Sequence, residues 1–346
     1  MNKNILAGAA LFTVALSMPV SAQEQSTTKE NTATANQYQP VPVPEIRKIR
    51  LFISTDAKNE ADDQFAIVQA ILTPKFKIKG IISSQYSNTA KLMERNAEGT
   101  MDEGYAEIQK VVGLMDLATP PAIYHGAKQA IKDERTAEVS EGAKAIVAEA
   151  MKDDKTPLYV ISLGPITDLA SAYLLEPKIA NKVTAVWIGG GDYPKGGWEY
   201  NLFNDPSAAN VIFKSKMPVW QVPRAVYSTM RTSLSEISYK VKPHGKIGEY
   251  LFTQMVDFNE WASNKFPTLN WPKGESWSLG DNPAVSVLLD EHEYGYKDQP
   301  VYVFDQKNFE YKKFKSNKKI RVYHYVDPRF TLEDMFAKIA LAYPAK

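Results

Sequence analysis

The alternation of apolar and polar residues along the chain predicts short buried strands separated by helices. Continuous apolar runs, which are typical of strands covered on both faces, occupy residues 51–53, 158–163, 183–188 and 218–222. Further strands are expected at 76–84 and 122–126, and helices at 62–72 and 141–151 and from about residues 167 and 205 onward. This alternation predicts an α/β fold with a single open, mostly parallel sheet and helices on both faces.

The last third of the chain has a different pattern. Residues 236–265 have helical character, whereas residues 300–326 alternate between apolar and polar positions. Alternation is typical of strands with one solvated face, so we predict a late antiparallel hairpin there and a closing helix at 331–342. Together with the sheet, these elements are expected to form one domain over residues 46–346.

Residues 1–22 have the pattern of a secretory signal peptide. An apolar segment follows Lys3, and Val20-Ser21-Ala22 forms a small-residue cleavage site. The apolar segment is too short to span a bilayer, and no second long apolar run follows it. We therefore expect a secreted or periplasmic protein that is cleaved after the signal peptide and has no part in a membrane. Residues 23–45 are expected to be a disordered, proline-containing leader.

The composition narrows the classes of partner. The 346 residues carry a formal net charge of +1, so no global electrostatic field favours nucleic acid or a membrane surface. No cysteine is present, which excludes disulfides and thiolate metal sites. The four histidines lack the spacing of a zinc site and stand at His125, His244, His292 and His324. The composition leaves small molecules and metals bound by oxygen ligands as possible partners. It does not decide whether the protein forms a homo-oligomer.

An acidic loop follows the first predicted strand. Asp56 ends the strand, and Asp62 and Asp63 open the next helix. Open α/β sheets bind ligands at the carboxyl ends of their strands, and three neighbouring carboxylates repel one another unless a cation neutralises them. Helix N-termini also recruit aspartate for capping alone, so this loop by itself fits a cation site and a solvated cap about equally well.

Other polar loops are expected at the same edge of the sheet. They contain Asn88, the Leu163-Gly164-Pro165 turn, Glu199 with Asn201, and Asp281 ahead of a proline-started helix. Carboxylates together with a backbone carbonyl form an oxygen-only set of donors. Such a set suits Ca²⁺ better than zinc.

Six stretches, in order within residues 49–290, resemble motifs of the inosine-uridine preferring nucleoside hydrolase superfamily. They are Ser54–Asp63, Gly80–Asn88, Leu163–Ala170, Ile188–Gly191, Glu199–Ala209 and Gly280–Val285. Any one of these matches is weak by itself, whereas six matches in the family's order imply the family's fold. The chain resembles a divergent, secreted branch of that superfamily.

The resemblance implies a role for each matching residue. Asp56 would be a calcium ligand and the base for the attacking water. The other calcium ligands would be Asp63, Asp281 and the main-chain carbonyl of Leu163. The ribose hydroxyls would be held by Asp62, Asn88, Glu199 and Asn201.

The chain departs from the family pattern where the nucleobase would lie. The first aspartate of the family's opening motif is Ser54, the loop that follows Asp56 is two residues longer, and the histidine before the last aspartate is Gly280. That histidine is the family's usual candidate for protonating the leaving base, so the sugar half of the site matches and the nucleobase half does not. Trp198 and Trp277 flank the matching loops and are our candidates for stacking on the base.

The resemblance implies a secreted, calcium-dependent hydrolase that cleaves the N-glycosidic bond of ribonucleosides or related ribosides, as in purine and pyrimidine salvage. The reaction would pass through an oxocarbenium-like ribosyl centre. The missing histidine leaves a second hypothesis open, a calcium-dependent protein that binds a furanosyl ligand with catalysis reduced or lost. Glu60, Tyr193 and Tyr227 are candidates for a substitute proton donor.

Overall fold

The computed structural model describes residues 41–291 and 293–345. The predicted signal peptide, residues 1–22, and most of the predicted leader, residues 23–45, lie outside the described residues, so both stay predictions. The described chain begins with a short 3₁₀ helix, η1 (Glu45–Arg47), and enters the sheet at Ile49.

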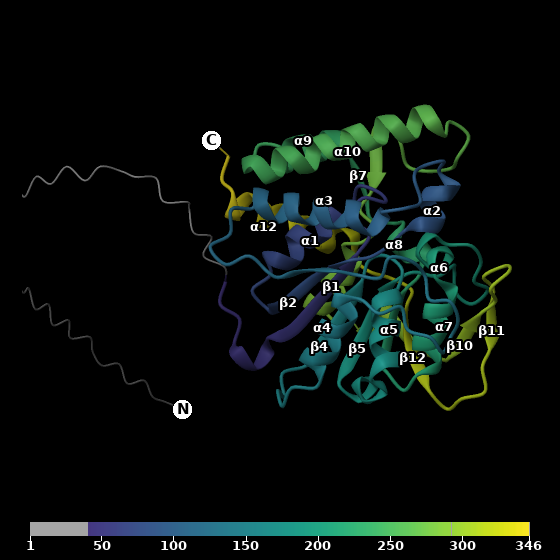
Figure 1. Cartoon of the computed structure of the whole chain (residues 1–346). Coiled ribbons are helices and arrows are strands. Elements are labelled where there is room, and N and C mark those ends of the chain that lie inside the picture. Colours follow the sequence, from purple (N-terminus) through teal and green to yellow (C-terminus); the bar gives the residue numbers. More distant parts are fainter. Residues whose placement is uncertain (1–40, 292, 346) are drawn as a thin grey trace, which may run out of the picture. The chain divides into compact units, whose positions relative to one another are not determined.

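An eight-stranded sheet runs through the described part of the chain (Figure 1), in the order β3-β2-β1-β4-β5-β6-β12-β9. All neighbours pair in parallel except β9, which pairs antiparallel with β12 at the edge. The strands are β1 (Ile49–Thr55), β2 (Phe76–Ser83), β3 (Ile123–His125), β4 (Leu158–Ser162), β5 (Val183–Ile188), β6 (Val219–Val222), β9 (Tyr296–Pro300) and β12 (Lys319–Tyr323). The predicted fold class, a mostly parallel open sheet, is confirmed.

Helices cover both faces of this sheet, because its strands have apolar side chains on both sides. In β1, Leu51 and Ile53 belong to one core layer and Phe52 to the other, as the two-residue period of a strand requires. Figure 1 shows the helices of the two layers on opposite sides of the sheet. The first layer contains α1 (Asp63–Ile71), α3 (Thr100–Leu114), α11 (Pro283–Leu289) and α12 (Pro328–Ala342), and the second contains α4 (Glu141–Ala150), α5 (Thr167–Leu175) and α7 (Pro206–Lys214).

The predicted helical region 236–265 is divided into two helices. These are α9 (Leu234–Lys240) and α10 (Gly245–Lys265). The break is explained by Pro243, which has no N–H for a helical hydrogen bond, and by Gly245, whose φ of +70° lies in the left-handed region. Next to these helices, β7 (Arg231–Ser233) and β8 (Ser276–Ser278) form a separate antiparallel pair.

The predicted late hairpin is present, and it is shorter than residues 300–326. It consists of β10 (Tyr302–Phe304) and β11 (Tyr311–Lys313), which pair antiparallel. The end of the alternating segment instead becomes β12 and joins the main sheet beside β6. The short elements between these units are α2 (Ser87–Leu92), α6 (Tyr200–Asn204), α8 (Arg224–Tyr227), η2 (Pro177–Asn181) and η3 (Glu293–Gly295).

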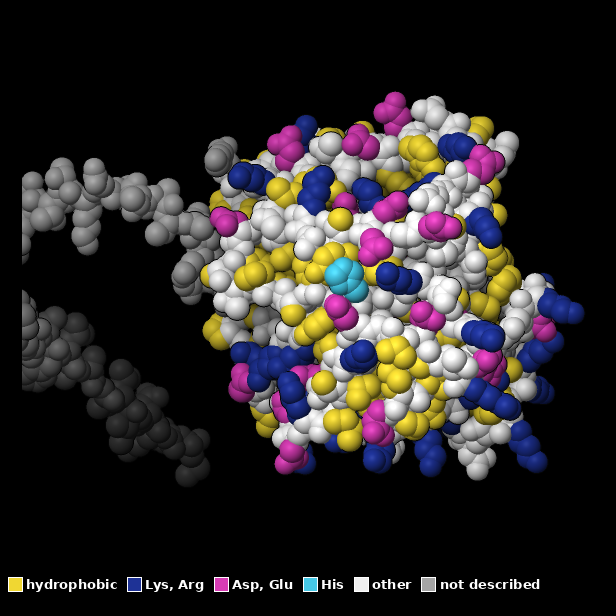
Figure 2. Space-filling view, viewed as in Figure 1, with side chains coloured by type: hydrophobic (Ala, Val, Ile, Leu, Met, Phe, Trp, Pro, Cys, Tyr) yellow, Lys and Arg dark blue, Asp and Glu magenta, His cyan; other side chains and the backbone are white. Residues whose placement is uncertain are grey.

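No helix in residues 41–291 and 293–345 is long and apolar enough to cross a membrane. Acidic and basic side chains are mixed over the face shown in Figure 2, in agreement with the formal net charge of +1. The charge of this face is therefore not concentrated in a patch of one sign.

Candidate active site

A cavity lies at the carboxyl ends of the central strands, where the strand order reverses. The chain passes from β1 to β2 and β3 on one side and then returns to β4, β5 and β6 on the other side of β1. Open α/β sheets bind ligands at such a reversal. The lining includes Asp56 after β1, Leu163 after β4, Ile188 at the end of β5 and Arg224 after β6.

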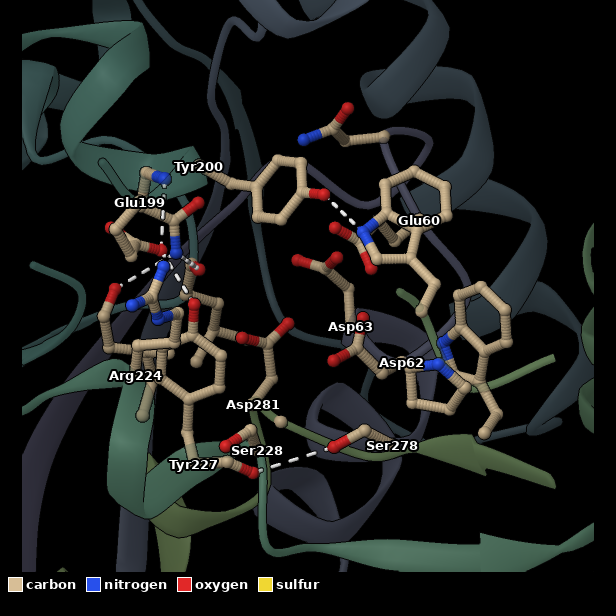
Figure 3. Close-up of a pocket in the computed structure, with 18 of the residues that line it drawn as sticks. Glu60, Asp62, Asp63, Glu199, Tyr200, Arg224, Tyr227, Ser228, Ser278 and Asp281 are labelled. Carbon is tan, nitrogen blue, oxygen red and sulfur yellow. Dashed lines mark hydrogen bonds between the residues drawn. The ribbon is translucent and has the colours of Figure 1, made fainter. Parts of the chain in front are cut away.

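The remaining lining residues come from the acidic loop, from the α6 region, from α8 and its C-cap, and from the segment around β8. They are Asn59, Glu60, Asp62, Asp63, Glu199, Tyr200, Asn201, Tyr227, Ser228, Asn270, Trp271, Pro272, Trp277, Ser278, Gly280 and Asp281. Figure 3 shows Glu60, Asp62 and Asp63 on one side of the cavity and Glu199, Arg224 and Tyr227 on the other.

Three buried carboxylates meet in this cavity. Asp62, Asp63 and Asp281 each place an oxygen within 4.8 Å of the others, and their exposed fractions are only 8%, 2% and 6%. Burial, followed by repulsion from Asp63, raises the pKa of Asp62 to about 8. Burial also raises the pKa of Asp63 to about 6, although Thr55 Oγ1 donates a hydrogen bond to it. The charged forms are therefore disfavoured until a cation approaches.

These residues fit a hard divalent cation. The donors that converge are carboxylate oxygens, and no histidine is among the described residues that line the cavity. Oxygen-only sets of this kind suit Ca²⁺ or Mg²⁺. The acidic triad Asp62, Asp63 and Asp281 could therefore hold a metal ion. Two of its members, Asp63 and Asp281, were predicted to be calcium ligands. The third, Asp62, was predicted to bind ribose.

Asp56 lies beside the triad and lines the same cavity. It is 3% exposed, and its Oδ2 accepts a hydrogen bond of 2.9 Å from Asn59 Nδ2. Burial raises its pKa well above the usual range, and the charge of Asp63 adds to this effect. The turn after β4 approaches Asp56 so closely that a Cβ at Gly164 would lie 2.4 Å from its Oδ1. Only glycine fits at that position without displacing the aspartate.

The Leu163 carbonyl reaches the cavity together with Asn201. Asn201 Nδ2 donates to the Leu163 oxygen at 2.6 Å and to the Ile188 oxygen at 2.9 Å. One amide therefore connects the ends of β4 and β5. A carbonyl has a second lone pair, so the Leu163 oxygen keeps one acceptor position for a ligand.

Glu199 is fully buried and caps the N-terminus of α6. Its carboxylate accepts hydrogen bonds from the backbone N–H groups of Asn201, Leu202 and Gly190, at 3.1, 2.9 and 2.8 Å. The hydroxyl of Tyr227 donates a fourth bond at 2.9 Å. Burial raises the pKa of Glu199 despite these donors. The four bonds fix its orientation, so it contributes a rigid negative charge to the cavity wall.

Two predicted substrate-binding residues do not line the cavity. Asn88 is exposed, and its Nδ2 donates to the Phe203 oxygen at 3.1 Å. Trp198 packs edge-on against Tyr200, with ring centroids 4.4 Å apart. The other predicted tryptophan, Trp277, is buried and does line the cavity. Of the proton-donor candidates, Tyr193 lies outside the lining and donates to Gln299.

Aromatic side chains, of which the sequence identified only part, line the same cavity as the acidic triad: Tyr200, Trp271 and Trp277. Trp271 Nε1 donates to the Tyr200 hydroxyl, and the rings of Trp271 and Trp277 meet edge to face at 6.2 Å. Trp271 and Trp277 precede the last matching motif by a few residues, and Tyr200 lies within the Glu199–Ala209 motif. Their positions beside the motifs could therefore have indicated that they line the site. Arg224 had no such signal, because no family motif covers it.

Tyr227 occupies the space beside Gly280. A Cβ at Gly280 would lie 3.0 Å from Tyr227 Cδ2 and 3.3 Å from Asp62 Oδ2. Burial and the neighbouring Glu199 raise the pKa of the Tyr227 hydroxyl far above its ordinary value. This hydroxyl is therefore a weaker acid than ordinary tyrosine.

Glu60 belongs to the lengthened loop after Asp56 and is partly buried. Burial, and then repulsion from Asp62, raises its pKa well above the usual range. Within the described residues it has neither a hydrogen bond nor an ion pair. Its carboxylate lines the cavity and is available to a ligand.

The fold of this chain is one that solved nucleoside hydrolases share. The purine-preferring ribonucleoside hydrolase from Gardnerella vaginalis superposes with a TM-score of 0.67 at 20% identity, covering 85% of this chain and 99% of that one. An inosine-guanosine nucleoside hydrolase gives 0.62 at 18% identity, covering 86% and 99%. At these identities the likeness establishes the fold.

The chain belongs to the inosine-uridine preferring nucleoside hydrolase family, whose model matches residues 51–331. The resemblance inferred from the six motifs is thereby confirmed. Among curated relatives, the pyrimidine-specific ribonucleoside hydrolase RihA of Escherichia coli is 25% identical over 182 residues, and that of Salmonella typhi is 28% identical over 171 residues. Each match covers 46% of this chain and 55% of the relative, so the chain spans about half the length of these curated relatives.

Proposed function

We propose that this protein hydrolyses the N-glycosidic bond of ribonucleosides or related ribosides with the help of a divalent cation, which we propose to be Ca²⁺. One observation carries the proposal. The buried triad Asp62, Asp63 and Asp281 lies in the same cavity as Asp56, at the carboxyl edge of a nucleoside hydrolase sheet. A site of this composition would hold a cation next to a general base.

The residues that would hold the ion are Asp56, Asp63, Asp281 and the main-chain oxygen of Leu163. Asp62 belongs to the same group of oxygens and would share the ion or hold a ribose hydroxyl. When bound, the ion supplies a fixed positive charge that orients ribose hydroxyls and lowers the pKa of a water molecule.

The side chains then perform the chemistry around the ribose. Asp56 accepts the proton of the attacking water, and Asn59 holds the orientation of its carboxylate. Glu199 and Asp62 place negative charge near the ribose, where positive charge develops as the glycosidic bond breaks. Asn201 keeps the two strand ends in register, and Trp271 and Trp277 offer apolar surface to the leaving base.

We further propose that the protein is exported, as the signal-peptide pattern of residues 1–22 predicts. Small nucleosides or ribosides are the proposed partners. The second candidate, a protein that binds a furanosyl ligand without turnover, is favoured by one observation: Gly280 offers no side chain that could protonate a departing base.

The test is a reducing-sugar assay with inosine, uridine and p-nitrophenyl riboside, in calcium and in excess chelator. We expect release of ribose that depends on calcium, with faster turnover of p-nitrophenyl riboside because its leaving group needs no protonation. Asp56→Asn is the inactive comparison and Asp153→Asn, an exposed residue paired with Lys155, is the matched control. Binding of ribosides without any release of ribose would contradict the hydrolase and support the binding protein.

A further inference from the structure

A chain of buried side-chain hydrogen bonds reaches Asp56 from outside the cavity. It is formed by Asn59, Thr89 and Asn204, whose exposed fractions are 3%, 0% and 0%. Of these three residues only Asn59 lines the cavity. Thr89 belongs to α2 and Asn204 is the last residue of α6, two helices that pack against each other (Figure 1). Two residues that do not line the cavity are therefore connected to the proposed base.

Asn59 contacts Asp56 and Thr89 with opposite ends of its amide. Its Nδ2 donates to Asp56 Oδ2 at 2.9 Å, and its Oδ1 accepts from Thr89 Oγ1 at 3.1 Å. Among the described residues no other donor reaches Asn59 Oδ1. An amide donates at its nitrogen and only accepts at its oxygen. The Thr89 hydroxyl therefore decides which end of the Asn59 amide faces Asp56.

The Thr89 hydroxyl has one proton and three acceptors within reach. They are Asn59 Oδ1 at 3.1 Å, the Tyr86 carbonyl at 3.1 Å and Asn204 Oδ1 at 3.3 Å. The last two already have donors, because the Ala90 N–H donates to the Tyr86 oxygen at 2.9 Å and the Thr89 N–H donates to Asn204 Oδ1 at 3.0 Å. A buried acceptor without a donor is costly, so the proton belongs on the bond to Asn59.

Asn204 fixes the direction of this hydroxyl from the far side. Its Nδ2 donates to Thr89 Oγ1 at 3.1 Å, so the hydroxyl oxygen faces Asn204 and its proton is available to Asn59. Reversal of the Asn204 amide would place two donors, its Nδ2 and the Thr89 N–H, against each other. The direction of the whole chain of bonds is therefore set at Asn204.

The loop that carries Asn59 is held by its backbone as well. Arg95, three residues after α2, donates from Nη1 to the Asn59 oxygen at 2.9 Å and from Nη2 to the Lys58 oxygen at 2.8 Å. The Asn59 N–H donates to the Asp56 oxygen at 2.7 Å. The segment around α2 thus fixes both the backbone and the side chain of Asn59. This is the loop that is two residues longer than the family motif, so the arrangement belongs to a departure of this chain from the family pattern.

We propose that Thr89 and Asn204 are positioning residues, which hold the Asp56 carboxylate in its working orientation through the Asn59 amide. This inference rests on the proposed hydrolase function and adds residues that do not touch the substrate. A base must lie within hydrogen-bond reach of the water whose proton it accepts, and a displacement of about 1 Å can lower a rate about a hundredfold. The proposed ribose contacts do not involve Asn59, so loss of the chain of bonds lowers kcat and leaves KM nearly unchanged.

A double-mutant cycle tests this proposal, with p-nitrophenyl riboside as substrate at saturating calcium. Thr89→Val removes the hydroxyl at nearly constant volume, and we expect it to lower kcat about tenfold at an unchanged KM. Asn59→Ala should lower kcat at least as much. In the double variant the effect of Thr89→Val should disappear, because a residue that acts through another gives a non-additive effect. Thr89→Ser keeps the hydroxyl and should keep the kcat of the wild type.

Thr73→Val is the matched control, because Thr73 is also buried and its hydroxyl bonds Gln69 and Lys338 outside the cavity. We expect this variant to have the kcat of the wild type. If Thr89→Val does not fold, Asn204→Asp takes its place. That substitution removes the amide nitrogen, and the new carboxylate draws the Thr89 proton away from Asn59, so kcat should again fall at an unchanged KM.

Three results would overturn the positioning role and leave the hydrolase proposal intact. They are an unchanged kcat in a folded Thr89→Val, an effect of Thr89→Val that has the same size with and without Asn59, and a Thr89→Ser variant as slow as Thr89→Val. A rise in KM without a fall in kcat would do the same. Release of no ribose by the wild type would instead overturn the proposed function, and this inference with it.

Discussion

Removal of the divalent cation should make the folded protein lose stability as the pH rises. In the folded state the pKa values of Asp62 and Asp63 rise to about 8 and about 6 from an ordinary value of 3.8. Between about pH 4 and pH 8 the folded state therefore binds protons that the unfolded state has released. Stability falls with rising pH wherever the native state binds more protons, so the contribution of these two carboxylates is greatest below about pH 4 and is lost as the pH rises through their raised pKa values.

The size of this loss of stability can be worked out from the pKa shift of Asp63 alone. A rise from 3.8 to about 6, at about 1.4 kcal/mol per pKa unit, corresponds to about 3 kcal/mol of lost stability at neutral pH. About half of this loss, roughly 1.4 kcal/mol, falls between pH 5 and pH 7.5. For a domain of this size 1 kcal/mol moves the melting temperature by roughly 2–3 °C, so we expect Asp63 alone to lower it by about 3–4 °C between these two pH values. Calcium at a hundred times its Kd should return about 2.7 kcal/mol, which is enough to cancel most of the loss.

The assay is thermal unfolding followed by circular dichroism at about pH 5 and about pH 7.5, with chelator or with calcium. Asp281→Asn should reduce the pH-dependent loss, because it removes one of three repelling carboxylates, and should abolish the calcium effect. Exposed Asp153→Asn should behave as the wild type. A metal-free wild type that melts at the same temperature at both pH values, or an equal calcium effect in Asp281→Asn, would refute the reasoning.

Three further predictions concern single side chains. Asp56→Asn should lower kcat by about 10²–10⁴-fold, the usual worth of general base catalysis, at an unchanged far-ultraviolet spectrum; near-normal turnover would show that the base lies elsewhere. Gly280→His, although it restores the family residue, should lower the melting temperature without raising inosine hydrolysis, because its Cβ would lie 3.0 Å from Tyr227; a more active and equally stable variant would contradict this. Glu199→Ala should destabilise the protein by several kcal/mol in denaturant titration, since buried N–H groups such as that of Gly190 lose their acceptor at about 1–3 kcal/mol each; a loss below about 1 kcal/mol would show that water replaces the carboxylate.

The strands and their order of appearance could be predicted because burial on both faces leaves continuous apolar runs. Leu51–Ile53 and Val183–Ile188 are examples. The hairpin boundaries could not, because β12 alternates like a hairpin strand yet pairs in parallel with β6. β12 lies between β6 and the antiparallel edge strand β9; tertiary contacts decide this pairing, and alternation reports only that one face of a strand is solvated.

The candidate site was predictable where a carboxylate follows a strand, as Asp56 follows β1, or stands at or just before a helix start, as Asp63 and Asp281 do. All three residues line the cavity. Asn88 could not be placed from its motif, because α2 turns its amide toward the Phe203 carbonyl and away from the cavity. Arg224 reaches the cavity through the short helix α8, for which no periodicity exists in four residues.

The triad also sets an order of events during folding. Two of its members, Asp62 and Asp63, lie near the start of the described chain, whereas Asp281 enters more than two hundred residues later. An emerging chain that has not yet produced residue 281 has no complete ion site, and the closure of so long a loop is entropically costly. Capture of the proposed ion would therefore be a late step, after the six strands β1 to β6 have been made, and a truncated chain would keep the electrostatic repulsion without an ion to relieve it.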